Sequence, residues 1–334
     1  MSTHGSFLFR KMKERWAFVL LGFLGLLVAY GTYLPPEDPC AYSSELGNCF
    51  GERVQKIIKE RGLATGVAYV HNVLLADYGF EVVHMLLHDV GMYAYAKEKD
   101  LSRALAYIDP YARTAKYPEY IDGFDGYYHG VIMGFFMSNR DRDVQDLILD
   151  VCERDLVLPG GEKSSTPFNC YHAIGHALMH LYGNVVEKSL RVCDTVVEHA
   201  KKEGCYQGVF MENAYLYSSA YSRGVSRESV QGSSMAALCN KQQGLRAETC
   251  SRFVGQSYLG LMRPTDLRGA FKECEKVSEH YEVCAQWLSV MFIPIFYGED
   301  HTLMTKACGL AHPLYREVCI ETIDFGVDYG FGNR

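Results

Sequence analysis

The sequence predicts an all-α protein in which disulfide bonds clamp repeated helix pairs, placed after one N-terminal transmembrane helix. Three features support this: regularly spaced cysteines, aromatic-rich segments that restart at the same point of each spacing, and a long uncharged run near the N-terminus. The composition is globular, because 48% of the 334 residues are hydrophobic and 22% are charged. It excludes a disordered chain, a collagen-like chain and a small disulfide-rich toxin.

Residues 16–34 carry no charge and are the candidate membrane anchor. As a helix they span roughly 28 Å, close to the hydrocarbon thickness of a bilayer. Four basic residues and one acidic residue lie in 1–15, so the positive-inside rule places that segment in the cytosol. A cleavable signal peptide ending near Ala29 is the alternative, but the long apolar run favours an uncleaved signal-anchor. In both cases the main domain is exported to a periplasmic, extracellular or luminal space.

The predicted organisation has four parts: a cytosolic N-terminus at 1–15, the transmembrane signal-anchor at 16–34, a juxtamembrane segment at 35–51, and an exported α-helical repeat domain at 52–334. The net charge is −7 and residues 1–15 contribute +3, which leaves −10 on the exported part. This negative charge argues against nucleic acid as a partner. The expected partners are the membrane, through the N-terminal helix, and another envelope protein.

The twelve cysteines fall into six consecutive pairs separated by 9, 18, 12, 11, 10 and 11 residues. The pairs are Cys40 with Cys49, Cys152 with Cys170, Cys193 with Cys205, Cys239 with Cys250, Cys274 with Cys284, and Cys308 with Cys319. The last four second cysteines follow one another at steps of 45, 34 and 35 residues, a period typical of helical repeats. In an exported chain we expect disulfides, and the pairing rests on spacing because sequence alone leaves connectivity open.

Each repeat is predicted to contain an amphipathic first helix that ends near the first cysteine and a more buried second helix that starts at the second. Three earlier second helices fit the same pattern from Phe80, Asp125 and Asn169. The region 52–334 is therefore predicted to be one solenoid of about seven helix pairs, with the second helices lining a concave face.

Five histidines occupy three successive second helices and form the candidate metal site: His84, His88, His129, His172 and His176. Two pairs are spaced i, i+4, which puts both imidazoles on one helix face with Cβ atoms roughly 6 Å apart. The alignment places His84, His129 and His172 in a row. We expect a transition metal ion (Fe, Cu or Zn) on the concave face. Packed or hydrogen-bonded core histidines are the alternative, but later repeats lack these histidines, which favours a site.

Acidic and tyrosine residues surround these positions in the sequence. The candidate outer partners, which would orient the imidazoles, are Glu81, Asp125, Tyr128 and Tyr171. The candidate catalytic bases are Glu212 and Asp89. His180 continues the i, i+4 series, but it is about 12 Å along the helix from His172 and cannot bind the same ion.

The sequence therefore predicts a membrane-anchored extracytoplasmic metal-binding protein, specifically a hydrolytic or oxidative metal-dependent enzyme. Two alternatives stay open: a non-catalytic helical-repeat scaffold in an envelope complex, and a metal or haem carrier using pairs such as His129 and Met133. The chain has no P-loop, no GxGxxG, no CxxCH and no HExxH motif.

Overall fold

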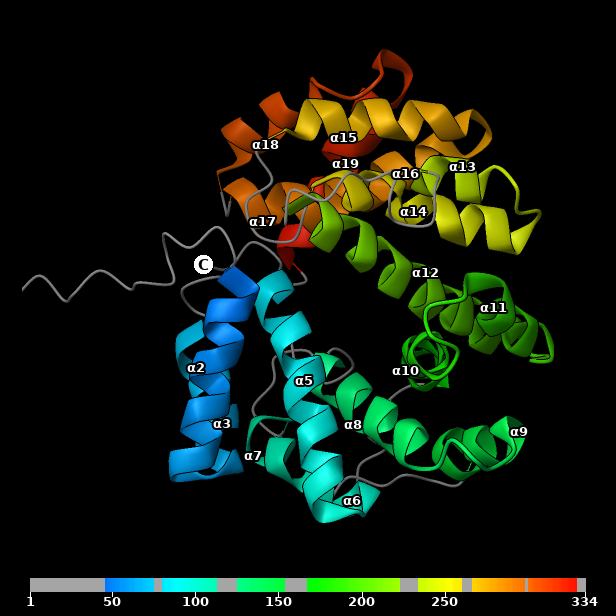
Figure 1. Cartoon of the computed structure of the whole chain (residues 1–334). Helices are drawn as coiled ribbons and strands as arrows, with labels where there is room; N and C mark the ends of the chain where they lie inside the picture. Colours follow the sequence, from blue (N-terminus) through cyan, green and yellow to red (C-terminus); the bar gives the residue numbers. More distant parts are fainter. Residues whose placement is uncertain are drawn as a thin grey trace, which may run out of the picture. The chain divides into compact units, whose positions relative to one another are not determined.

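The computed structural model describes residues 46–74, 80–112, 125–153, 167–222, 234–259, 266–297 and 300–328. These residues form helices and no β-strand, so the predicted all-α class is confirmed for this part of the chain (Figure 1). The predicted anchor at 16–34 lies outside the described residues. Among the helices that are described, none combines the length and the low charge that a bilayer span needs.

Five long helices follow one another and carry most of the core. They are α5 (Phe80–Glu98), α8 (Asp125–Ser138), α10 (Pro167–Leu181), α12 (His199–Ser222) and α14 (Leu245–Leu259). Each packs against the next, and the series continues from α14 to α16 (Tyr281–Trp287) and, through the π-helical segment Leu288–Phe292, to α19 (Arg316–Asp328). Sequential packing of long helices is the arrangement expected for helical repeats.

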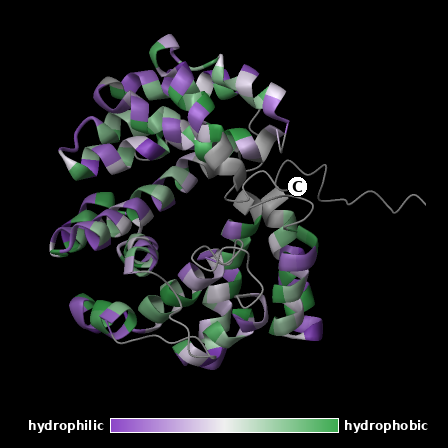
Figure 2. Ribbon diagram, turned by 180° about the vertical axis from the view of Figure 1, so that it is seen from behind, coloured by the Kyte–Doolittle hydropathy of each residue, from purple (hydrophilic) through white to green (hydrophobic). Residues whose placement is uncertain are grey.

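The other helices precede, separate or follow these five, and all except α2 are short. They are α2 (Leu46–Arg61), α3 (Leu63–Tyr69), α6 (Leu101–Leu105), α7 (Asp109–Ala112), α9 (Val144–Ile148), α11 (Val186–Asp194), α13 (Met235–Cys239), α15 (Leu267–Cys274), α17 (Ile293–Tyr297) and α18 (His301–Cys308). Helix α11 shows why they form: it buries Val186, Leu190 and Cys193 at helical spacing while charged residues face outward (Figure 2). Several begin at an aspartate or serine whose side chain accepts a backbone N–H, as Asp300 does for α18.

Five disulfides confirm five of the predicted cysteine pairs: Cys152–Cys170, Cys193–Cys205, Cys239–Cys250, Cys274–Cys284 and Cys308–Cys319. Each joins a short helical segment to the helix that follows it, namely α10, α12, α14, α16 or α19. Cys49 is also disulfide-bonded, and its predicted partner Cys40 lies outside the described residues. The prediction that the second helix starts at the second cysteine is wrong by several residues. Helix α12 starts at His199, before Cys205, and α14 starts at Leu245, before Cys250.

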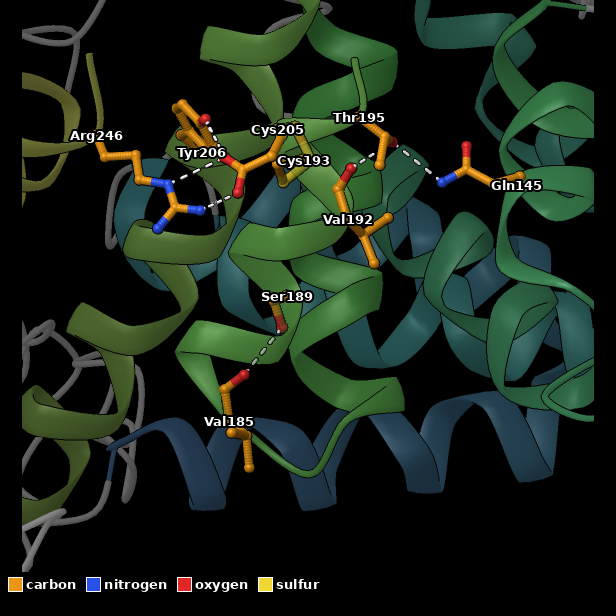
Figure 3. The surroundings of a disulfide bond; sticks show 10 residues. Gln145, Val185, Ser189, Val192, Cys193, Thr195, Cys205, Tyr206 and Arg246 are labelled. Atoms are coloured by element: carbon orange, nitrogen blue, oxygen red, sulfur yellow. Dashed lines mark hydrogen bonds and ion pairs between the residues drawn. A yellow bond between two sulfur atoms is a disulfide. The ribbon is translucent and has the colours of Figure 1, made fainter. Parts of the chain in front are cut away.

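The Cys193–Cys205 disulfide lies in a polar network that ties neighbouring repeats together (Figure 3). Asp194 at the end of α11 accepts hydrogen bonds from the Tyr206 hydroxyl at 2.6 Å and from Nε of Arg246 at 3.1 Å. Arg246 belongs to α14, so the contact connects α14 to the helix pair that precedes it. On the other side, Gln145 of α9 donates to the Thr195 hydroxyl at 3.1 Å.

Glycines allow two pairs of long helices to touch backbone to backbone. A Cβ atom at Gly130 of α8 would lie 2.1 Å from the carbonyl oxygen of His88 on α5, and one at Gly208 of α12 would lie 2.0 Å from that of His172 on α10. Both separations are too short for any side chain, so only glycine permits these contacts. The pairs α5–α8 and α10–α12 therefore repeat one packing arrangement.

These contacts also show that the repeats align differently from the prediction. Gly130 and Gly208 contact His88 and His172, while Gly126 and Gly204 contact His84 and Phe168. His88, rather than His84, is therefore the counterpart of His172 in the helix packing. The difference is one helical turn, which the sequence spacing alone does not distinguish because i and i+4 share a face.

Candidate metal centre

The five predicted histidines come together inside the helix stack, where α5, α8 and α10 meet. They are 2% (His84), 2% (His88), 2% (His129), 6% (His172) and 0% (His176) exposed. The prediction places them on a concave face, whereas the structure buries them between helices. Neighbouring helices meet backbone to backbone at Gly130 and Gly208, beside His88 and His172, and so cover these imidazoles.

Four of the imidazoles form a compact group of potential ligands: His84, His88, His129 and His176. One nitrogen of each lies within 4.8 Å of those of the other three. Around one ion with metal–nitrogen bonds of about 2.05 Å, two ligand nitrogens are at most about 4.1 Å apart. The widest pair therefore needs to close by at least about 0.7 Å, and by about 1.4 Å in a tetrahedral site, for all four to bind one ion.

Two nitrogen pairs already have the separation of neighbouring ligands. Nε2 of His88 lies 3.1 Å from Nε2 of His84, and Nε2 of His176 lies 3.0 Å from Nε2 of His172. Ligand nitrogens on one ion are about 2.9 Å apart at a 90° angle and about 3.4 Å apart at the tetrahedral angle. Both observed separations fall within that interval.

His129 is the central ring of the cluster. Its ring centroid lies 5.3 Å from that of His84, 5.5 Å from that of His88, 4.9 Å from that of His172 and 5.1 Å from that of His176. Its Nδ1 is buried and has no hydrogen-bond partner among the described residues. A buried polar atom without a partner costs about 1–3 kcal/mol, and a bound ion would supply that partner.

Three acceptors hold the outer nitrogens of the imidazoles. Nδ1 of His84 donates to Asp125 Oδ1 at 3.1 Å, and Nδ1 of His176 donates to Glu212 Oε2 at 2.7 Å. Nδ1 of His172 lies 2.9 Å from Gln207 Oε1. An acceptor at Nδ1 keeps the hydrogen there and leaves the Nε2 lone pair facing the centre, as in zinc sites with carboxylate–histidine pairs.

Burial keeps the cluster neutral. Removal from water lowers the pKa of four histidines: His88, His129, His172 and His176. Although burial alone would raise the pKa of Glu212, hydrogen bonds from His176 and His180 hold that pKa below its usual range. Neutral imidazoles beside an ionised carboxylate are the protonation states that metal binding requires.

His180 lies at the edge of the centre. Its Nε2 donates to the second oxygen of Glu212 at 3.2 Å, and 32% of its side chain is exposed. Burial lowers the pKa of His180, but the hydrogen bond to Glu212 and the charges of Glu212 and Asp89 together outweigh it and raise the pKa overall. Glu212 thus bridges the buried His176 and the half-exposed His180, which the sequence spacing did not indicate.

The remaining predicted site residues lie in different places. Tyr128 is buried beside the His129 ring, but the Tyr171 hydroxyl donates to Glu153 at 2.9 Å. Asp89 is exposed and lines a cavity of about 420 Å³ between α2 and α5. The Glu81 side chain lies outside the described part of the structure.

Two residues that the sequence did not single out complete the surroundings. Gln207 binds His172, as described above, and the Tyr215 ring packs within 6.3 Å of His84 and 6.5 Å of His176, measured between centroids. Both lie on α12, as does Glu212. The aligned positions of α12 have no histidine, so the histidine repeat does not indicate that this helix contributes to the site.

No protein-family model, characterised protein or solved structure matches the chain. The functional conclusion therefore rests on the site itself. The buried four-histidine group could hold a transition metal ion. The five disulfides are typical of an extracellular or otherwise oxidising compartment.

Proposed function

We propose that this chain is an exported metalloprotein that holds one transition metal ion in its buried histidine centre. The proposed ligands are His84, His88, His129 and His176. The observation that carries the proposal is the convergence of these four buried imidazoles within 4.8 Å, one of them with an unpartnered Nδ1. Packing alone does not account for four buried imidazoles facing one another, since apolar side chains would fill the same space at lower desolvation cost.

The type of ligand atom limits which metal ions this site can bind. All four proposed ligands are imidazoles, while the nearby carboxylates of Asp125 and Glu212 bind the outer nitrogens. Imidazole suits zinc, copper, iron and nickel, whereas magnesium and calcium prefer oxygen ligands. Two outer carboxylates would also balance the charge of a divalent ion.

The proposed role is catalytic, with a metal that supplies redox or Lewis-acid chemistry. Exposures of 0–6% for the imidazoles favour oxidation chemistry on a small reactant over hydrolysis of a large substrate. Glu212 has both oxygens engaged, so we assign it to orienting His176 rather than to acting as a base. The same enclosure also favours the second candidate, a metal carrier without chemistry.

The location and partners are part of the same proposal. Residues 16–34 would anchor the chain, and the domain would lie on the oxidising side of the membrane, beside another envelope protein. The support is the uncharged run in the sequence and the disulfides of the domain.

Elemental analysis of the purified full-length chain tests the proposal. We expect about one equivalent of zinc, copper or iron in the wild type, because a preorganised imidazole site retains such ions through purification. A His88→Ala/His176→Ala double variant removes two ligands and should lose the bound metal. His199→Ala is the matched control, since that side chain is 76% exposed and lies outside the cluster.

The wild type and the double variant should also be reloaded with zinc and titrated with a competing chelator. Equal zinc affinity in the two proteins would rule out the histidine centre as the binding site. A wild type that takes up no metal at all would show that the imidazoles form a hydrogen-bonded core instead.

A further inference from the structure

With the Gln207 amide oriented as in the structure, the contact between His172 and His176 has no hydrogen. The two oxygens of Glu212 lie 2.7 Å from Nδ1 of His176 and 3.2 Å from Nε2 of His180, so Glu212 accepts from both imidazoles and Nδ1 of His176 carries the hydrogen. Gln207 presents its oxygen to Nδ1 of His172 at 2.9 Å, so that nitrogen must also carry a hydrogen. A neutral imidazole has one N–H, and both Nε2 atoms are therefore left with lone pairs.

These two lone pairs face each other across 3.0 Å. Two acceptors at that distance repel unless a cation lies against both. A metal ion bound by both Nε2 atoms would remove the repulsion. With metal–nitrogen bonds of about 2.05 Å, a 3.0 Å separation corresponds to an angle of about 94°, nearer to the right angles of a five-coordinate ion than to the tetrahedral angle.

We infer that His172 is a fifth nitrogen ligand of the centre and that Gln207 is its positioning residue. This inference rests on the proposed function and extends it from four ligands to five. Gln207 is 6% exposed and comes from α12, the helix that also supplies Glu212. One helix thus sets the tautomers of both His172 and His176.

The competing arrangement differs in one respect. If the Gln207 amide is turned, its NH₂ group donates to Nδ1 of His172, and the hydrogen on Nε2 of His172 is donated to His176. The contact is then an ordinary hydrogen bond and His172 is not a ligand. Oxygen and nitrogen of an amide are assigned from the network, so the two arrangements are separated by experiment.

Three variants of the full-length chain, loaded with cobalt(II) or zinc alone, make the test. Gln207→Leu removes the acceptor and should weaken zinc binding 10–100-fold, as other outer partners of metal ligands do. Gln207→Glu supplies an acceptor that has no N–H and should bind zinc at least as tightly as the wild type. His172→Ala should shift the cobalt(II) visible spectrum towards stronger absorption, as expected when a ligand is lost and the ion becomes four-coordinate.

Gln256→Leu is the matched control, because Gln256 is a buried glutamine of α14 whose oxygen accepts from Trp287 Nε1 at 3.0 Å. It should leave zinc affinity and the cobalt spectrum unchanged. The inference is overturned if His172→Ala keeps the wild-type cobalt spectrum, or if Gln207→Glu weakens zinc binding tenfold while the wild type binds one equivalent. A wild type that binds no metal would instead refute the proposed function together with this extension.

Discussion

His129 shows how much a single side chain contributes to the centre. It is the only proposed ligand from α8, and its ring contacts all four other imidazoles of the cluster. Its buried Nδ1 lacks a partner within the described residues. By contrast, His84 and His176 each have a carboxylate on the outer nitrogen. The centre therefore combines ligands that carboxylates orient with one whose Nδ1 has no such partner in the described part of the chain.

Acid should destabilise the metal-free protein. The pKa values of His88, His129, His172 and His176 are lowered by burial in the folded state, so below pH about 6.5 the unfolded chain binds more protons. Their contribution to stability is present above that pH and is lost as the pH falls. The raised pKa of His180 acts in the opposite direction but involves one group. Urea unfolding should give a smaller free energy of unfolding at pH 5.5 than at pH 7.5.

Removal of two of these histidines tests whether they cause the loss of stability in acid. Each histidine that stays neutral in the fold costs up to about 1.4 kcal/mol per pH unit below 6.5. A His88→Leu/His129→Leu double variant removes two such groups and should flatten the pH dependence. An unchanged dependence in that variant would show that other groups cause it.

At the scale of helices, two glycine contacts hold the site together. Gly130 lets α8 reach the backbone of α5 at His88, and Gly208 lets α12 reach the backbone of α10 at His172. Each contact therefore lies at a histidine of the cluster. The spacing between helices sets whether Asp125, Gln207 and Glu212 reach their histidines.

Gly208→Ala should damage both stability and metal binding. The added Cβ would lie 2.0 Å from the His172 carbonyl oxygen, so α10 and α12 must separate, at a cost of about 1–3 kcal/mol or more. Separation would also break the hydrogen bonds that join α12 to the three histidines of α10. Thermal unfolding and zinc titration would measure the two effects.

Gly51→Ala in α2 is the control for this substitution. Its Cβ would have a nearest neighbour at 3.9 Å, an ordinary contact, and alanine favours the helix by up to about 1 kcal/mol. The interpretation fails if the two alanine variants unfold at the same temperature.

At the scale of the molecule, disulfides and the histidine centre divide between two halves of the chain. The five histidines come from α5, α8 and α10, whereas four of the five described disulfides lie at or beyond Cys193. Helix α12 belongs to both halves, because it carries the Cys205 disulfide as well as Gln207 and Glu212. Helix α12 therefore links the stability of the disulfide-bonded half to the geometry of the histidine centre.

Removal of individual disulfides tests this link. Replacing Cys193 and Cys205, or Cys308 and Cys319, by alanine should each lower stability by about 2–4 kcal/mol, because both close loops of similar length. Only the first disulfide includes a cysteine of α12, the helix that orients the histidines. Only its loss should therefore also weaken zinc binding. Equal zinc affinity in both variants, measured by chelator competition, would contradict the link.

Sequence patterns predict the helix class, the five cysteine pairings that the structure confirms and the five histidines of the cluster. These follow from local regularities: a disulfide across a ten-residue connection keeps its spacing, and i, i+4 histidines share a face wherever the helix packs. Asp125 and Glu212 were also found from the sequence as acidic neighbours, though Glu212 was predicted as a base and is placed against His176 and His180.

Only the tertiary structure decided the burial of the centre, the register of the repeats and the partners on α12. Gln207 and Tyr215 meet the histidines because helices distant in sequence pack side by side, and no local pattern marks such residues. The register depends on which carbonyl each glycine meets, a backbone contact between helices that hydrophobic periodicity does not encode. Spacing along a helix is a local property, whereas the burial of a side chain and the residues that it contacts depend on how the helices pack.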